Sequence, residues 1–119
     1  MTIGGVENEL LVKLMSASSK RAEVIANNIA NQNTPGFKRQ TLEFEKLLST
    51  AMDGDTRRLM DIEPSLTVDK ESPSGADGNN VNIELEMNSM RQNRLLYETY
   101  ASILSSRFEV LRASIENGR

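Results

Sequence analysis

Cysteine, histidine and tryptophan are absent from this sequence of 119 residues, which has only two tyrosines and three phenylalanines. Without cysteine or histidine there is no disulfide framework, no thiolate nucleophile, no imidazole base and no zinc site built from those ligands. An enzyme would have to use carboxylates, Lys, Tyr or Ser, and no glycine-rich phosphate-binding loop occurs. These absences favour a protein that is not an enzyme and that needs no cofactor or small-molecule substrate.

Strong charge and long apolar runs are absent as well. The 14 basic and 17 acidic side chains give a net charge of −3, which argues against attraction to nucleic acid or to anionic membranes. No apolar run approaches the roughly 20 residues needed to cross a bilayer. The first residues include Glu7, Glu9 and Lys13, which argues against a cleavable secretory signal. We therefore expect a protein that stays inside the cell, or one that leaves it without a cleaved leader.

Composition divides the chain into an N-terminal helical segment (residues 1–52), an acidic middle (53–80) and a C-terminal helical segment (81–119). The middle contains Pro64, Pro73 and no aromatic residue. Such a segment buries too little apolar surface to offset about 1–2 kcal/mol per residue of backbone ordering. The sequence predicts a flexible connection there, with a short extended piece at residues 66–68.

The strongest periodic signal lies in the C-terminal segment, where steps of four and three residues alternate over more than four heptads. This pattern predicts a helix of roughly 34 residues, about 50 Å long. Asn82 is a suitable N-cap, and Asn117-Gly118 supplies a stop. Only Arg94 interrupts the apolar seam, which consists of Ile83, Met87, Met90, Arg94, Tyr97, Ala101, Leu104, Phe108, Leu111 and Ile115.

The N-terminal segment repeats this pattern more weakly and predicts a helix over residues 5–30. Its stripe consists of Leu11, Met15, Ser18, Ala22, Ile25 and Ile29. Thr34-Pro35-Gly36-Phe37 predicts a turn, because Pro suits its second position and Gly its third. A shorter third helix is predicted to begin at Thr41 and to continue through Leu42, Glu45, Leu47, Leu48 and Met52.

The predicted fold is all-α, with two long terminal helices that pair as a coiled coil, a short third helix and a flexible, partly extended middle. The C-terminal helix is longer than the diameter of a compact globule of this chain length, about 35 Å. Part of its seam therefore needs neighbours, which favours self-association or a larger assembly. A monomeric helical hairpin or three-helix bundle is the alternative that periodicity leaves open.

Charged residues outside the seam are predicted to be solvated rather than functional. Lys20-Arg21 and Lys38-Arg39 form two basic pairs without an aromatic platform. Glu84, Glu86 and Glu98 are interpreted as residues that cap and solvate the C-terminal helix, because their spacing does not build a carboxylate site.

Two stretches carry a family resemblance. Residues 26–39 read ANNIANQNTPGFKR and follow the predicted N-terminal helix, while residues 77–87 read DGNNVNIELEM and begin the C-terminal helix. The first resembles the N-terminal signature of the bacterial flagellar basal-body rod and hook proteins. Together the two are most similar to the proximal rod subunits of that family, over residues 8–50 and 77–116.

The resemblance implies a structural subunit of the bacterial flagellum, in the proximal rod of the basal body. It implies polymerisation through paired terminal helices into a tube that serves as the base of the drive shaft in motility. Expected partners are further copies, other rod subunits, the membrane ring and the export gate. The expected location is the periplasmic space, reached by flagellar type III export without leader cleavage. The alternatives are a cytosolic helical adaptor or export chaperone, or another rod subunit of the same family.

The resemblance also assigns site residues, all of them interfacial. In the N-terminal helix, the residues expected at helix pairing and assembly are Leu11, Met15, Ala22, Ile25 and Ile29. They are expected to face Met90, Tyr97, Leu104, Phe108 and Leu111. The family turn motif is expected to contact neighbouring subunits through Asn28, Asn31, Asn33, Pro35, Gly36 and Phe37. On the residues alone, this asparagine-rich stretch is an ordinary helix stop.

Overall fold

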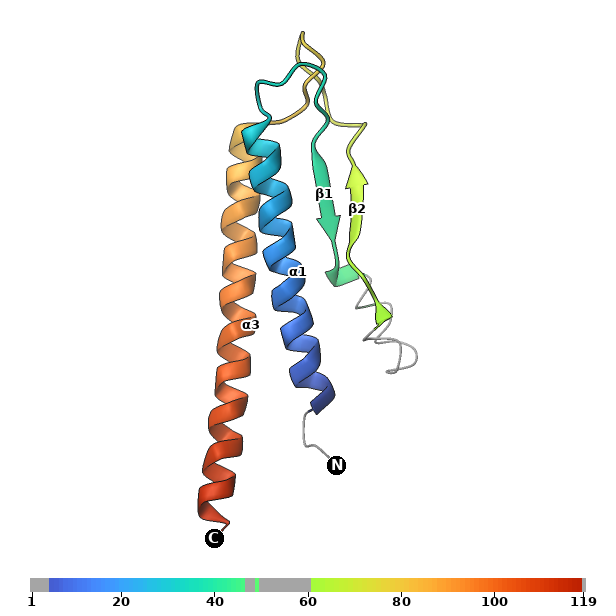
Figure 1. Ribbon diagram of the computed structural model, residues 1–119. Helices are drawn as coiled ribbons and strands as arrows, with labels where there is room; N and C mark the ends of the chain where they lie inside the picture. The colour runs from blue at the N-terminus through green and yellow to red at the C-terminus, as the bar shows by residue number, and fades with distance from the viewer. Residues whose placement is uncertain (1–4, 47–48, 50–60, 119) are drawn as a thin grey trace.

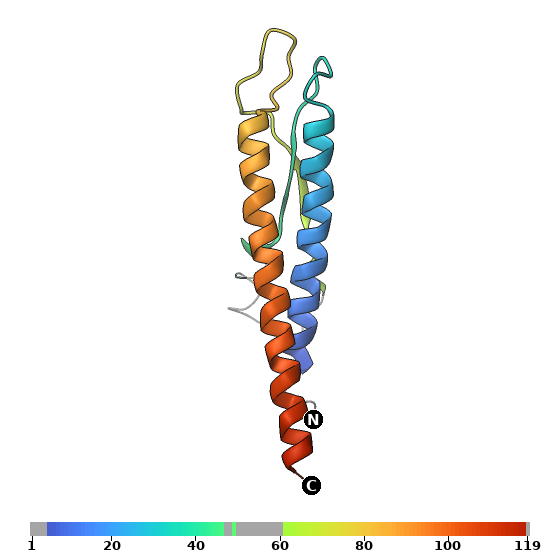
Figure 2. The ribbon, with the colours of Figure 1, turned by 90° about the vertical axis from the view of Figure 1, so that its left-hand side faces the viewer.

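Two long helices and a two-stranded ribbon form an elongated molecule (Figure 1). The computed structural model describes residues 5–46, 49 and 61–118. Helices α1 (Gly5–Ala30) and α3 (Ile83–Asn117) lie side by side and antiparallel in both views (Figures 1 and 2). The radius of gyration is 18.4 Å and the dimensions are 68 × 27 × 15 Å, whereas a compact chain of this length has a radius near 14 Å.

Both predicted long helices are present, and local signals explain where α3 starts. The side chain of Asn82 accepts hydrogen bonds from the backbone N–H groups of Glu84 at 3.1 Å and Leu85 at 3.3 Å. The cap satisfies two of the first N–H groups of the helix, which have no partner within it. Helix α1 spans the predicted residues 5–30. No helix among the described residues is long and apolar enough to cross a membrane.

The predicted turn after α1 is present as well. Phe37 N–H donates to the carbonyl of Thr34 at 3.2 Å, and Gly36 has a φ of 74°. A type II turn needs a positive φ at its third residue, which favours glycine there, and Pro35 presets the second. This turn directs the chain away from α1 and back along its side.

The third helix predicted from Thr41 is wrong at its start, because residues 40–43 are extended. Strand β1 (Gln40–Glu43) pairs antiparallel with β2 (Ser65–Val68), with Leu42 opposite Leu66. The cause is non-local, since the side chain of Asn28 holds the backbone of Gln40 on one side and β2 pairs on the other. Strand β2 contains the predicted extended piece. Leu47, Leu48 and Met52 of the predicted helix lie outside the described residues.

The apolar core is small and lies where the chain after β1 meets α1. Phe44 is only 2% exposed and packs with the buried Ala17, and the half-buried Leu10, Leu14 and Ile62 surround them. Burying a phenylalanine side chain contributes about 1.5–3 kcal/mol. This cluster therefore fastens the ribbon to the helices at its lower end.

We predict that Phe44→Ala lowers the free energy of unfolding by about 3–5 kcal/mol, because it leaves a cavity in this cluster. Urea denaturation followed by circular dichroism measures the change. Phe108→Ala is the matched control, since Phe108 is 52% exposed. Its effect should stay within about 0.5 kcal/mol. Equal losses in the two variants would contradict the assignment of the core to Phe44.

Candidate assembly interface

Polar side chains meet along the line where α1 and α3 touch. The contacts are Arg107 Nη2 to Glu7 Oε2 at 2.9 Å, Arg21 Nε to Asn93 Oδ1 at 2.7 Å, and Asn28 Nδ2 to Glu86 Oε2 at 3.2 Å. Between successive contacts the residue number rises by seven and then by fourteen along α3, and it falls by the same amounts along α1. This is the heptad spacing of paired helices, and polar groups inside such a pair specify its register. The contacts therefore define one antiparallel register.

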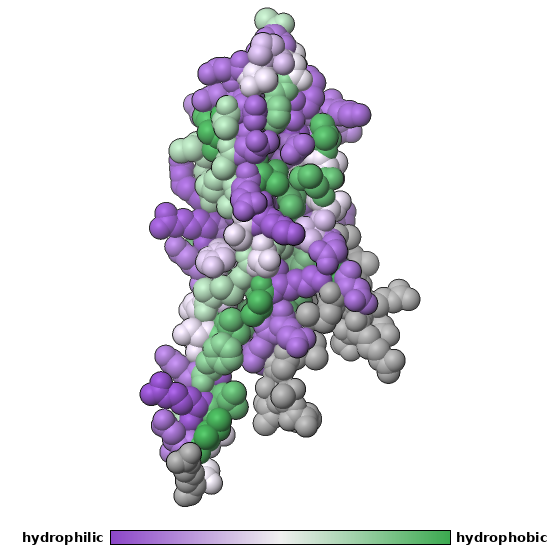
Figure 3. Space-filling model, in the orientation of Figure 1, coloured by the Kyte–Doolittle hydropathy of each residue, from purple (hydrophilic) through white to green (hydrophobic). Residues whose placement is uncertain are grey.

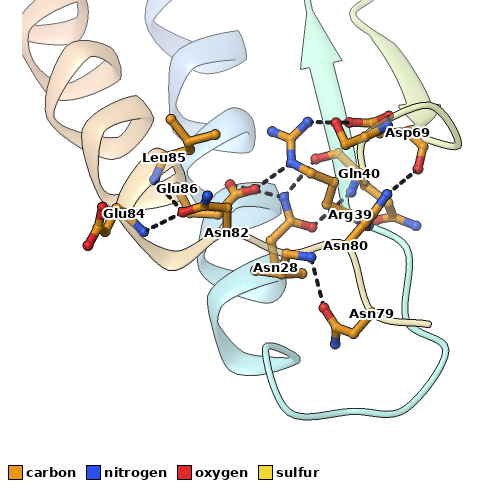
Figure 4. A network of polar contacts seen from close by, with 12 residues as sticks. Asn28, Arg39, Gln40, Asp69, Asn79, Asn80, Asn82, Glu84, Leu85 and Glu86 are labelled. Atoms are coloured by element: carbon orange, nitrogen blue, oxygen red, sulfur yellow. Dashed lines mark hydrogen bonds and ion pairs between the residues drawn. The ribbon is translucent and has the colours of Figure 1, made fainter. Parts of the chain in front are cut away.

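The upper end of this line is a buried carboxylate, that of Glu86, which is 0% exposed. Arg39 Nε donates to Glu86 Oε1 at 2.5 Å, and Asn28 Nδ2 lies within hydrogen-bond distance of the other carboxylate oxygen (Figure 4). A buried charge is costly unless it is paired and hydrogen-bonded, and both conditions are met here. Glu86 thereby holds α3 against α1 and against the residue that leads into β1.

The side chain of Asn28 has a second role at the ribbon. Its Oδ1 accepts from Gln40 N–H at 2.9 Å, and its Nδ2 donates to Gln40 O at 2.8 Å. These are the two hydrogen bonds that a residue of a neighbouring strand would make. The buried amide of Asn28 thus closes the outer edge of β1 at Gln40.

Arg39 also pairs with Asp69, just beyond β2. Arg39 Nη1 lies 2.9 Å from Asp69 Oδ2, and the hydroxyl of Ser72 donates to the same oxygen at 2.5 Å. Hydrogen bonds from the hydroxyl and backbone of Ser72, and then from Arg39, hold the pKa of Asp69 well below its usual range. Burial alone would lower the pKa of Arg39, but hydrogen bonds to Glu86 and Asp69 raise it. The arginine therefore bridges two carboxylates.

Asn80 closes the end of the ribbon. Its Oδ1 accepts from Arg39 N–H at 2.7 Å, and its Nδ2 donates to the carbonyl of Asp69 at 2.7 Å. Next to it, Asn79 Nδ2 donates to the carbonyls of Asn31 and Thr34, both at 2.8 Å. The segment that leads into α3 is therefore fastened both to the ribbon and to the turn after α1.

A second charged contact joins α1 to the chain after β1. Two guanidinium nitrogens of Arg21 donate to the two carboxylate oxygens of Glu45, at 2.9 and 2.6 Å. Burial alone would raise the pKa of Glu45, but hydrogen bonds from Arg21 and from the backbone, together with the charge of Arg21, outweigh burial and lower the pKa. Burial, and then the charge of Glu45, raise the pKa of Tyr100 on α3. Arg21 thus contacts both α3 and the end of the ribbon.

The structure corrects the interpretation of four charged residues as solvated, since Lys38 is half-buried too and donates to Ser74 Oγ and to the carbonyl of Gly78. Arg21 and Arg39 are half-buried and paired, and Glu86 is buried. For Arg21 and Glu86 the sequence signal is a spacing of seven, from Arg21 to Asn28 and from Glu86 to Asn93. By contrast, Glu84 and Glu98 are exposed, as expected for solvated residues.

The residues predicted to pair the helices fall into two groups. Ile25 is buried, whereas the half-buried ones are Leu11, Met15, Ala22, Ile29, Met90 and Leu104. Tyr97, Phe108 and Leu111 are exposed. Arg94, which interrupts the seam, is exposed and contacts Glu98 of its own helix at 3.2 Å. A single chain therefore covers the first group at least in part and leaves the second group at the surface.

Two residues of the exposed group, Phe108 and Leu111, belong to an apolar face on the C-terminal half of α3. Figure 3 shows apolar surface along this part of the molecule, in the orientation of Figure 1. The face consists of Ile103, Phe108, Val110, Leu111 and Ile115, and we call it the α3 face. Because Arg107 contacts Glu7 near the start of α1, the last residues of α3 extend beyond α1 (Figures 1 and 2). Several large apolar side chains exposed on one end of a helix are typical of an interaction site.

The family turn motif is divided between interior and surface. Asn28 is buried and Asn31 and Phe37 are half-buried, whereas Asn33, Pro35 and Gly36 are exposed. Gly36 N–H donates to the carbonyl of Asp77 at 2.8 Å. The motif thus contributes to the fold through Asn28, while its exposed tip is available to neighbours.

The buried polar groups of the structure are paired with one another. Within the described ranges, every buried side-chain nitrogen and oxygen has a hydrogen-bond partner. The same ranges contain no group of acidic residues arranged to hold a metal ion. The candidate functional feature is therefore the α3 face, positioned by the polar contacts.

Comparison with known proteins agrees with the resemblance found in the sequence. Residues 15–38 match the family described as flagella basal body rod protein. The chain is similar to the flagellar basal body rod protein FlgB of Borrelia hermsii, with 31% identity over 98% of this chain and 100% of the relative. It is 32% identical to FlgB of Aquifex aeolicus over 90% of each chain. FlgB of Bacillus subtilis is 28% identical over 99% of this chain and 95% of the relative.

The polar contacts predict a specific dependence of stability on pH. The folded-state pKa of Asp69 lies below its unfolded value of about 3.9, so its contribution is complete above that pH and is lost as the pH falls below it. Asp69→Asn should lower stability at pH 7 and flatten the decrease between about pH 5 and pH 2.

Urea denaturation at a series of pH values measures this change in slope. The control is Asp61→Asn, which alters an exposed carboxyl and should leave the slope unchanged. A curve for Asp69→Asn that runs parallel to the wild-type curve would show that Asp69 does not contribute to the pH dependence.

Proposed function

Since the chain belongs to the FlgB family of flagellar basal body rod proteins, we propose that it is a structural subunit of the basal-body rod. In this proposal α1 and α3 pair as a coiled coil, and the pair packs against neighbouring subunits. The chain has no catalytic duty in this role. Its function is to present fixed apolar surface in a fixed direction.

The α3 face is the observation that supports this proposal. Leaving several large apolar side chains in water forgoes about 1.5–3 kcal/mol for each one that could be buried. Phe108 and Leu111 are exposed in the single chain, and the end of α3 projects past α1. A neighbouring subunit that covers this end would bury the face, so contact between subunits is favoured.

The pairing residues take two roles in this proposal. The buried or half-buried members, such as Ile25 and Leu104, stabilise contact between α1 and α3. Tyr97, Phe108 and Leu111 contact neighbouring subunits, together with the exposed tip of the turn motif at Asn33, Pro35 and Gly36. In this proposal the exposed end of α3 and the tip of the turn carry assembly, and residues 69–80 hold the upper end of the helix pair together.

The finer parts of the proposal depend on the resemblance of residues 26–39 and 77–87 to the family signatures. They are a proximal position at the base of the drive shaft, contact with the membrane ring and export gate, and arrival in the periplasmic space by type III export. The match over nearly the whole chain supports the same neighbours as in other FlgB proteins.

We predict that Leu111→Asp abolishes swimming while changing the free energy of unfolding by only about 0.5 kcal/mol, because the residue is exposed in the single chain. A charge there would be buried without a partner when a neighbour packs on the face. Soft-agar motility in a strain that lacks the chromosomal copy measures the effect.

Ser105→Asp is the matched control, since it introduces the same charge at an exposed polar position of α3. This variant should swim normally. Normal swimming of Leu111→Asp would remove the α3 face from the assembly surface. If the wild-type protein did not restore swimming, the proposed function itself would fail.

A further inference from the structure

The outer edge of β2 is formed by the backbone of Leu66 and Val68. Asp69 N–H donates to the directly opposed carbonyl of Arg39 at 2.9 Å, so this is a hydrogen-bonded pair of the ribbon. In an antiparallel ladder, hydrogen-bonded and non-hydrogen-bonded pairs alternate. The N–H and C=O groups of Thr67 therefore point toward β1, and those of Leu66 and Val68 point away from it.

The two outer edges of the ribbon differ in the hydrogen bonding of their backbone groups. On β1, the outward groups of Gln40 are both satisfied by the buried amide of Asn28. On β2, no described residue contributes a hydrogen bond to the outward groups of Leu66 or Val68. Strand β2 also lies at the margin of the molecule, on the side away from α3 (Figure 1). One edge is thus closed by Asn28, and the other is left open by the part of the chain that the structure describes.

The side chains along the open edge are apolar. Leu66 and Val68 are 56% and 43% exposed. Directly opposed residues of two strands share a face, so Leu66 lies on the same face as the buried Leu42. The face with which β1 packs on α1 therefore extends to β2, where the side chains of Leu66 and Val68 are exposed. An added strand with apolar side chains on that face would extend the core.

The opening is short because both ends are blocked. Pro64 occupies the next outward position on one side and has no N–H to donate. Lys70 occupies the next outward position on the other, where a charge discourages uncontrolled strand pairing. Two residues with outward backbone groups, about 6.8 Å apart, match the spacing of an extended chain.

We infer that this edge binds an extended segment of another protein of the basal body, by strand addition. The segment carries apolar side chains at alternate positions, so that one side of it covers Leu66 and Val68 while its backbone bonds theirs. The inference rests on the proposed function, because it places the added strand in the assembled rod. A second β2 is a poorer occupant, since two identical strands pair about a two-fold axis and form a closed dimer that cannot continue a rod.

The test removes one outward donor and leaves the ribbon ladder intact. Val68→Pro eliminates the N–H that points away from β1, while the donors that face β1, such as Thr67, are unchanged. Val68→Thr is the matched control, because it keeps both the N–H and a β-branched side chain. Leu66→Pro and Leu66→Thr form an independent pair. Circular dichroism and thermal melting of the purified proteins identify the variants that fold.

The readout is the amount of each variant in basal bodies isolated from a strain lacking the chromosomal copy. We expect Val68→Thr to assemble at the wild-type level and Val68→Pro to fall about tenfold, as expected for one lost hydrogen bond at a buried interface. Equal incorporation of folded Val68→Pro and Val68→Thr would overturn the inference and leave the rod function standing. Failure of the wild type to enter basal bodies would instead contradict the rod function.

Hydrogen exchange of the wild-type protein decides the question even if both proline variants unfold. In the free protein, the amides of Leu66 and Val68 should exchange faster than that of Thr67. In basal bodies they should become protected. Continued fast exchange there would overturn the inference. So would a purified dimer that Val68→Pro converts to a monomer, because the occupant would then be a second copy.

Discussion

Glu86 carries a negative charge into the interior, and the surrounding structure compensates it. Removing a carboxylate from water costs several kcal/mol unless cations and hydrogen bonds replace the solvent. Arg39, the residue before β1, supplies the cation, and Asn28 of α1 supplies a further hydrogen bond. Both partners have further duties, since Arg39 also binds Asp69 and Asn28 also binds Gln40. The charge of Glu86 is therefore one point at which both helices and the ribbon are joined.

The same arrangement explains why so much apolar surface is left outside. Where α1 and α3 touch, the heptad positions of α3 are occupied by polar or amphipathic residues: Glu86, Asn93, Tyr100 and Arg107. The apolar residues flank this line instead of filling it. Apolar surface that lies on both sides of the contact line is too wide to be covered by one neighbouring helix. The small core around Phe44 holds the parts together, and the remaining surface is left for contacts between molecules.

Local features could be predicted from the sequence, and non-local ones could not. The Asn82 cap and the turn at Pro35-Gly36 depend on a few adjacent residues, so both can be predicted from the sequence. Strand β1 depends instead on an amide twelve residues away and on a strand beyond the acidic middle. The buried state of Arg21, Arg39 and Glu86 is equally non-local. These residues differ from solvated charges only in having partners far away in the sequence, and a spacing of seven does not identify those partners.

Because Glu86 is anchored near the first turn of α3, that helix cannot roll over α1. A rotation by one residue turns a helix by about 100°, which would swing the carboxylate away from Arg39. Further along, the contacts of Arg21 with Asn93 and of Arg107 with Glu7 oppose the same rotation. The two helices therefore twist and bend as one beam. The molecule as a whole, ribbon included, measures 27 by 15 Å across its long axis, so it is a flat strip that bends less readily across its width than across its thickness.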